Sequence, residues 1–316
     1  ETITASLCLK EDTLWAKRGF EVAFGQGTWQ VDEIEVPDEA EAVDATDFAR
    51  VARCRRYQAE LALETQQEQP LHVVHGDITL GVRGEGFEIL FSSASGNLTS
   101  YKYNGVELLE ELPKPSFWRA PVDNDYGRRD FMTAQWKLAS LYRRCVKKEL
   151  RDETGIWQEF DWFGQLGQKE YDAKDLSVRF TYELATQPLS SCCLTYTVEG
   201  DGAIRTELDY EAVEGLPEIP DFAMIFTLPA DYDRIRFYGY GPLDNYADRC
   251  QGAKLGIYET TTRDEVEPYL LPQETGNHGG IRWFEATDKR GRGVRLAMDE
   301  EPFEASALPY SAHELE

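Results

Sequence analysis

The chain has 316 residues, with 33 Lys and Arg against 58 Asp and Glu, which gives a formal net charge of -25. A charge of this sign repels phosphate backbones and anionic lipid head groups, so we expect neither nucleic acid nor a membrane surface as a partner. Hydrophobic residues make up 41% of the sequence, enough to bury a core, yet no apolar run approaches the roughly 20 residues of a membrane-spanning helix.

Residues 1–34 begin with two stretches that favour β-strands. Ile3–Leu9 and Gly19–Phe24 are apolar, and polar residues join them as in a hairpin. An isolated hairpin is only marginally stable in water, so it should pack against the rest of the chain or belong to a sandwich with further strands upstream. The chain starts at Glu1, within such a strand, and its first residues have neither the basic start nor the apolar stretch of a signal peptide. We therefore expect a piece of a longer protein.

Residues 35–70 form an acidic segment that we interpret as an interdomain linker. Its first half is rich in Asp and Glu, contains Pro37 and has little hydrophobic periodicity, which is typical of a solvated connection. Residues 47–64 can form a short helix, although like-charged arginines interrupt its apolar face.

From Gly76 onward, apolar and polar residues alternate with the period of two that predicts β-strands. The alternating stretches are residues 78–82, 87–91, 176–184, 194–198 and 204–210. Gly84–Gly86 separates the first two stretches and indicates a hairpin turn. The single persuasive helical spacing covers Phe131–Cys145. Short strands separated by turns predict an all-β fold, a large antiparallel sandwich.

Three clusters of polar and aromatic residues follow one another within the strand-rich region. The first ends with Asp123, Asn124, Asp125, Tyr126 and Gly127, which can offer hydrogen-bond acceptors to sugar hydroxyls or can form a structural Asx turn. The second, Phe237–Arg249, places aromatic rings beside glycines, where they can stack on a sugar or simply fill the core.

The third cluster, Pro268–Gly280, places Glu274 four residues before His278. Glutamate and histidine are common proton carriers, so the pair suggests an acid/base function, and the alternative is a polar loop between strands.

The cysteines and histidines give no sign of a metal site. Six cysteines occur without a C-x-x-C pair, and four histidines occur without an H-E-x-x-H motif. We interpret the cysteines as free, mostly buried thiols in a reducing cytoplasm, and we assign no metal ligands.

The three clusters resemble, in order and interval, signatures of the lactose-operon type β-galactosidases of glycoside hydrolase family 2. FWRAPVDNDYG, YGYGPLDNYADR and PYLLPQETGNHGGIRWF are similar to three successive signatures of the family's C-terminal small-chain domain. Upstream, SGNLTSYKYNGVELL resembles strands near the start of that domain. The resemblance implies a galactose mutarotase-like supersandwich over residues 71–316, preceded at residues 1–34 by the last strands of an immunoglobulin-like domain.

The resemblance also implies that catalysis takes place in another part of a larger enzyme. In the family, two glutamates of a (β/α)₈ barrel cleave terminal β-galactosides such as lactose with retention of configuration, and this chain does not contain that barrel. The implied partners are the barrel and other domains, the galactoside and further copies of the enzyme. Mg and Na are implied to bind through other domains, so we expect no cofactor on this chain.

For the site residues, the resemblance places Asp123–Gly127 at the start of a mobile loop that borders the substrate pocket. Gly127 matches a hinge-like position, where alanine would be unfavourable if φ is positive. The family domain continues past the position of Glu316 with further strands and a tryptophan of the sugar platform, so we expect a C-terminally truncated domain.

Two other functions fit the same residues. A free-standing aldose mutarotase would use Glu274 and His278 as its acid and base. A carbohydrate-binding module would bind galactose or lactose without any chemistry.

Overall fold

A computed structural model describes residues 2–28, 70–128, 133–167 and 169–315, and it divides into two compact units. Unit 1 contains residues 2–28, 233–267 and 275–308. Unit 2 contains the described residues from 70 to 232, together with 268–274 and 309–315. Unit 1 thus contains both the N-terminal segment that was predicted to be immunoglobulin-like and strands from residues 233–308. The domain boundaries expected from the sequence stay predictions.

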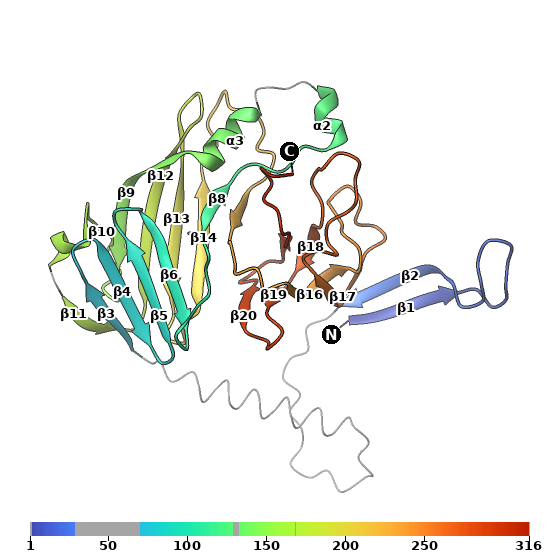
Figure 1. Ribbon diagram of the computed structural model, residues 1–316, viewed down its shortest axis with the longest axis horizontal. Helices are drawn as coiled ribbons and strands as arrows, with labels where there is room; N and C mark the ends of the chain where they lie inside the picture. Colours follow the sequence, from blue (N-terminus) through green and yellow to red (C-terminus); the bar gives the residue numbers. More distant parts are fainter. Residues whose placement is uncertain (1, 29–69, 129–132, 168, 316) are drawn as a thin grey trace, which may run out of the picture. The chain divides into compact units, whose positions relative to one another are not determined.

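Two antiparallel sheets form the body of unit 2 (Figure 1). The six-stranded sheet has the order β11-β3-β4-β5-β6-β7, with β3 (Leu71–His75), β4 (Thr79–Gly84), β5 (Phe87–Ser92), β6 (Asn97–Tyr103), β7 (Val106–Glu107) and β11 (Glu170–Ala173). The five-stranded sheet has the order β10-β9-β12-β13-β14, with β9 (Arg143–Arg151), β10 (Gln158–Glu159), β12 (Leu176–Leu184), β13 (Ser190–Val198) and β14 (Ile204–Tyr210). A small third sheet pairs β8 (Lys114–Ser116) with β15 (Ala223–Ile225).

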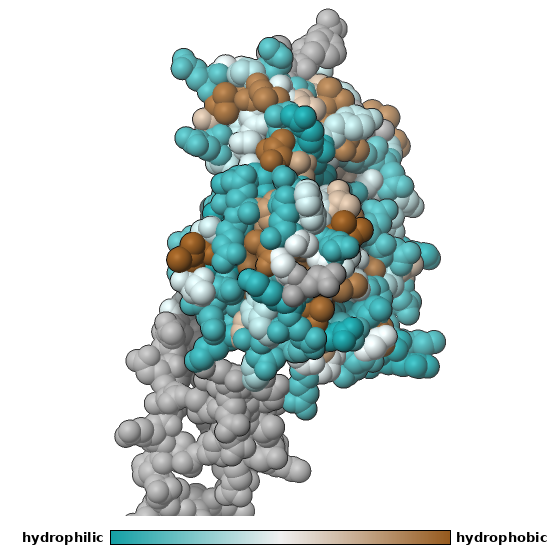
Figure 2. Space-filling view, turned by 90° about the vertical axis from the view of Figure 1, so that its left-hand side faces the viewer, coloured by the Kyte–Doolittle hydropathy of each residue, from teal (hydrophilic) through white to brown (hydrophobic). Residues whose placement is uncertain are grey.

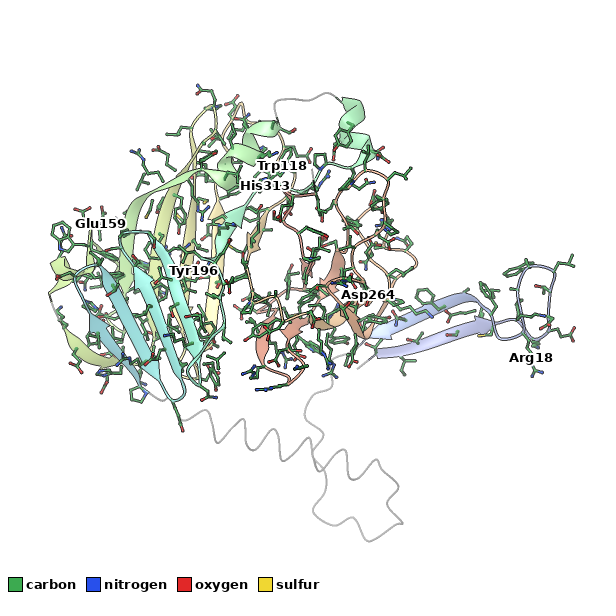
Figure 3. The ribbon with its side chains drawn as sticks, in the orientation of Figure 1. Arg18, Trp118, Glu159, Tyr196, Asp264 and His313 are labelled. Atoms are coloured by element: carbon green, nitrogen blue, oxygen red, sulfur yellow. The ribbon has the colours of Figure 1, made fainter. Side chains whose placement is uncertain are left out.

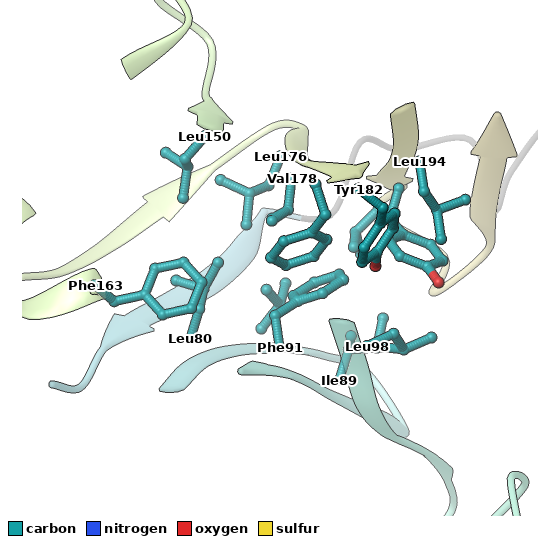
Figure 4. Close-up of a cluster of buried hydrophobic side chains, with 14 of the residues drawn as sticks. Leu80, Ile89, Phe91, Leu98, Leu150, Phe163, Leu176, Val178, Tyr182 and Leu194 are labelled. Atoms are coloured by element: carbon teal, nitrogen blue, oxygen red, sulfur yellow. The ribbon is translucent and has the colours of Figure 1, made fainter. Parts of the chain in front are cut away.

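The core of unit 2 lies between its two large sheets, where their apolar faces meet (Figure 4). The alternating apolar residues of β12 are all at most 2% exposed, and their polar neighbours point to the other face. Tyr196 is buried among these side chains and donates its hydroxyl to the side chain of Asn97, 2.9 Å away (Figure 3). Burial raises the pKa of Tyr196 because the phenolate would lose its hydration. The all-β sandwich predicted from period-two alternation is confirmed.

The strand predictions hold in detail, but the helix prediction was wrong in extent. The turn between β4 and β5 has Gly86 at φ +80, a value that glycine adopts without strain. Helix α3 covers only Ala134–Leu141, and Tyr142 already has an extended backbone. The residues from Arg143 onward, including Cys145, instead pair with β12. Sheet pairing outweighs helical spacing here because each paired residue gains ladder hydrogen bonds.

Unit 1 contains a four-stranded sheet and two strand pairs. The sheet has the order β17-β16-β19-β20, with β16 (Arg234–Gly241), β17 (Lys254–Thr261), β19 (Trp283–Thr287) and β20 (Gly293–Ala297). One pair joins β18 (His278–Ile281) to β21 (Phe303–Ala305), and the other is the predicted hairpin of β1 (Thr2–Cys8) and β2 (Glu21–Thr28). Gln26 bonds the backbone of Leu255, and Glu21 forms an ion pair with Lys254. The hairpin therefore packs against β17, one of the two alternatives predicted.

The remaining expectations concern the polarity of the surface, membrane-spanning helices, the burial of the cysteine thiols and the helix predicted near the N-terminus. On the side of the molecule shown in Figure 2, hydrophilic residues predominate and hydrophobic ones lie in small separate groups. None of the helices in the described segments is long and apolar enough to cross a membrane. Among the five cysteines that the structure describes, all are free, but only Cys192 is buried, so the expectation of mostly buried thiols was wrong. The helix predicted at residues 47–64 lies outside the described residues.

Candidate functional site

The segment with the first signature is anchored in unit 2 by helix α3. Phe117 is fully buried, and its backbone N–H donates to the Ser140 hydroxyl at 2.8 Å. Ser140 in turn donates to the carbonyl of Trp136, also at 2.8 Å. The rings of Phe117 and Trp136 lie 5.7 Å apart. The buried start of the signature is therefore fixed by both packing and hydrogen bonds.

After this anchor, the structure places Asp123–Arg128 in a short helix, α2, so the loop conformation predicted for residues 123–127 was wrong. Asp125 organises the turn into the helix: its carboxylate accepts from Arg119 at 2.7 and 3.2 Å and from the Val122 N–H at 2.8 Å. A carboxylate that caps a turn in this way favours helix formation. Gly127 lies within α2, where φ is negative, so the left-handed backbone expected there does not occur.

The other predicted residues of this segment face solvent. Asp123 and Asn124 are exposed, and Tyr126 is 52% exposed. They can offer two acceptor groups and one ring face to a sugar. Their position at a substrate pocket remains a prediction.

In unit 1, two asparagines join the second and third signatures. The N–H of Asn245 donates to the carbonyl of Asn277 at 2.7 Å, and the side chain of Asn277 donates back to the carbonyl of Asn245 at 2.9 Å. The side chain of Asn245 also donates to Tyr240 and accepts from Gly279. The two signatures therefore form one hydrogen-bonded unit, although 32 residues separate the asparagines.

His278 belongs to the same network, and its carboxylate partner is Glu265, which sequence reasoning missed. Nε2 lies 2.7 Å from Glu265 Oε2, and Nδ1 lies 3.2 Å from the Tyr240 carbonyl. The carbonyl can only accept, so Nδ1 donates. A proton must also lie between Nε2 and Oε2, because two lone pairs at this distance would repel. Phe237 covers the ring, with its centroid 4.2 Å from that of His278.

This arrangement suits a structural role better than proton transfer to a substrate. The side chains of His278 and Glu265 are only 1% and 8% exposed, and both ring nitrogens already have protein partners. Glu274, the acid/base candidate predicted with His278, is half-buried and falls in a segment grouped with unit 2. No local spacing signals Glu265, because it lies in the irregular segment after β17.

A second histidine, His75, borders a pocket of about 430 Å³ in unit 2. His75 is 4% exposed, and its Nε2 lies 3.4 Å from the hydroxyl of Tyr171. Burial lowers the pKa of His75, with a smaller contribution from Lys169, and burial raises the pKa of Tyr171 to about 12. Both groups are therefore neutral at pH 7.

The lowered pKa makes unit 2 sensitive to acid. The unfolded chain takes up a proton on His75 below a pH of about 6.5, before the folded chain does. The stability that the neutral, buried His75 contributes is therefore present above a pH of about 6.5, and it is lost as the pH falls toward the lowered pKa of His75 in the folded chain. We expect His75→Leu to reduce the drop in Tm between pH 7.5 and 5.5.

The control for this prediction is His72→Gln, on the opposite face of β3. Hydrogen bonds that the His72 ring donates to Asp172 and to Glu170 raise the pKa of His72, so its removal should not reduce the acid sensitivity. An unchanged pH dependence of Tm in His75→Leu would contradict the prediction.

The described residues contain no group of three or more His, Cys, Asp or Glu side chains that could hold a metal ion.

Comparison with known proteins identifies what the chain resembles as a whole. Residues 83–316 match the family model described as the β-galactosidase small chain. A β-galactosidase of Halalkalibacterium halodurans is 36% identical over 99% of this chain and 27% of its own length. A β-galactosidase of Streptococcus thermophilus is 34% identical over 98% of this chain and 25% of its own length. The chain thus spans about a quarter of the length of these relatives.

A relative of similar size is the β-galactosidase small subunit of Latilactobacillus sakei. It is 32% identical over 78% of this chain and 80% of its own length. The same region therefore occurs both within long chains and as a separate subunit.

Proposed function

The chain belongs to the β-galactosidase small-chain family, and we propose that it is the non-catalytic C-terminal part of a β-galactosidase, here called the parent enzyme. The parent enzyme hydrolyses terminal β-galactosides such as lactose, with retention of configuration. The observation that carries this proposal is the match over nearly the whole chain to about a quarter of each long relative. The catalytic barrel belongs to the remaining part.

The proposal extends to the partners and cofactors. The chain binds the barrel and other domains of the parent enzyme, which works as a homo-oligomer in the cytoplasm. Other domains hold Mg and Na.

The state of three carboxylates in or next to the signature segments supports a non-catalytic role. A retaining glycosidase needs a carboxylic acid and a carboxylate about 5–5.5 Å apart, on either side of the scissile bond. Here Asp125 is bonded to Arg119, Asp244 to Arg249 and Glu265 to His278, each at 2.7 Å. A carboxylate that is held by a cation or an imidazole in this way is poorly suited to attack a sugar.

The test of the proposed function is hydrolysis of a chromogenic β-galactoside. We expect no turnover from the purified chain and normal turnover from the parent enzyme. Activity of the chain that survives removal of host enzymes and disappears in Glu274→Gln would overturn the non-catalytic assignment. A parent enzyme that does not hydrolyse β-galactosides would overturn the family function.

We further propose that α2 borders the substrate pocket of the parent enzyme through Tyr126. Tyr126→Ala in the parent enzyme should raise KM by about 2- to 10-fold, the equivalent of one aromatic contact worth about 0.5–1.5 kcal/mol. The Tm should stay unchanged because the side chain is half exposed. Tyr142→Ala, which removes another exposed tyrosine of unit 2, is the control. An equal KM in both variants would contradict the pocket position.

A further inference from the structure

The solvent-facing side of the five-stranded sheet in unit 2 carries a pocket of about 470 Å³. Its floor follows from the strand register. Arg151, Ser177, Thr197 and Arg205 lie opposite one another across β9, β12, β13 and β14. These residues alternate with the core residues of each strand, so they all point away from the core.

The next row on the same face contains Arg179, Thr195 and Glu207. The two rows together place guanidinium groups beside hydroxyl groups. Arg151 donates to the Ser177 hydroxyl and Arg179 donates to the Thr195 hydroxyl, each at 3.1 Å. Ser177 and Thr195 are only 2% exposed although they face outward, because other side chains cover them.

Trp157 holds the two arginines in place. The Cζ atoms of Arg151 and Arg179 lie 4.8 and 4.0 Å from the centroid of its ring. Contacts of this kind restrict the guanidinium groups and leave their outer N–H groups in fixed directions. The donors of the pocket are therefore arranged before any ligand binds.

A comparison within the chain shows what is unusual about this pair of arginines. In unit 1, Trp283 also lies beside two arginines, Arg236 and Arg295, at 5.5 and 5.0 Å. Each of those forms an ion pair with a glutamate of a neighbouring strand, at 3.4 and 3.7 Å. Among the described residues, neither Arg151 nor Arg179 has a carboxylate in an ion pair. The N–H groups that do not bond Ser177 or Thr195 are thus available to a ligand.

The charges around the pocket indicate the class of ligand. Asp175, Glu199 and Glu207 balance the three arginines of the lining, and Glu199 pairs with Arg205 at 3.7 Å. An anion would meet three carboxylates, and an apolar molecule would leave the charged groups without partners. A neutral molecule with several hydroxyls can accept from the arginines and donate to the carboxylates at the same time. The volume lies in the range of small-molecule sites.

We propose that this pocket binds a neutral mono- or disaccharide, held by Arg151, Arg179 and Glu207 against Trp157. The site is additional to the substrate pocket of the parent enzyme, and it does not rest on the proposed hydrolytic function. Its donors and acceptors all come from one sheet and its adjoining segments, so it is complete in this chain.

The test is titration of the purified chain with lactose, followed by calorimetry and by amide chemical shifts in β12, β13 and β14. We expect saturable binding with shifts at Thr195 and Thr197. Arg179→Gln and the exposed Glu207→Gln should each weaken binding by at least about tenfold, the loss of one charge-assisted hydrogen bond worth about 1.5–3 kcal/mol. The matched control is Arg295→Gln beside Trp283, which should bind lactose as the wild type does.

Inorganic phosphate and galacturonate are the anionic probes of the same experiment. Tighter binding of either than of lactose would overturn the neutral-sugar assignment, and so would lactose binding that Glu207→Gln leaves unchanged in a folded variant. No binding of lactose or galactose up to about 50 mM, roughly fiftyfold above the Kd of about 1 mM of a weak site, would also overturn it. None of these outcomes bears on hydrolysis by the parent enzyme, so the two proposals can fail separately.

Discussion

Replacement of Glu265 by leucine is expected to lower the free energy of unfolding of unit 1 by about 3–5 kcal/mol. Glu265 and His278 are buried together at 2.7 Å, and His278 has its other nitrogen bonded to Tyr240. Removal of the carboxylate leaves a buried ring nitrogen without a partner, which carries the full desolvation penalty. Native-state hydrogen exchange at the amides of β16 and β18 measures the loss in unit 1 itself.

Two further variants separate this effect from a general loss of charge. Asp264→Asn changes the neighbouring carboxyl (Figure 3), which is exposed and accepts a hydrogen bond from the Thr261 hydroxyl, and should change stability by less than about 0.5 kcal/mol. The double variant Glu265→Leu with His278→Phe should recover most of the loss, because apolar residues often replace a buried pair at little cost. Phe237 would then cover another aromatic ring. A single variant as stable as the wild type would contradict the prediction.

The second large effect is expected for Trp136→Ala, which should destabilise unit 2 by about 3–5 kcal/mol. Trp136 is fully buried, contacts the rings of Phe117 and Tyr210 at 5.7 Å each, and donates its indole N–H to the Pro217 carbonyl. Alanine leaves a cavity and an unpaired carbonyl. Urea unfolding followed by hydrogen exchange in β12 and β13 measures the change.

Leu138→Ala is the control on the same helix, because its side chain is 48% exposed and should matter little. Trp136→Ala should also loosen the hydrogen bond from Phe117 to Ser140, since α3 carries both anchors. Faster exchange of the Phe117 amide than of the β12 amides would confirm this local effect. Equal free energies of unfolding in Trp136→Ala and Leu138→Ala would contradict the predicted destabilisation.

The structure also reverses the effect that Gly127→Ala is expected to have on local stability. A hinge glycine with positive φ would make alanine unfavourable, but Gly127 lies in α2. Within a helix, alanine is favoured over glycine by about 1 kcal/mol. The sequence contained no hint of this helix, because α2 has only six residues, two of them acidic, and no apolar periodicity.

The sequence by itself determined strands β4, β5, β12, β13 and β14 and, with them, most of the core of unit 2. Alternation in β12 or in the β4–β5 hairpin is a local property, and one buried face forces the register of every residue in the strand. The same alternation determined which side chains of β12 and β13 face solvent. The three signatures determined the family.

Tertiary structure alone decided which distant polar groups meet. Glu265 reaches His278 across 13 residues, Asn245 meets Asn277 across 32, and Trp157 meets Arg179 only because β10, β9 and β12 are neighbours. It also decided that Arg143–Arg151 forms a strand rather than the end of a helix. The physical reason is that hydrogen bonds and ion pairs act over a few ångströms in space, whereas periodicity reports only on neighbours along the chain.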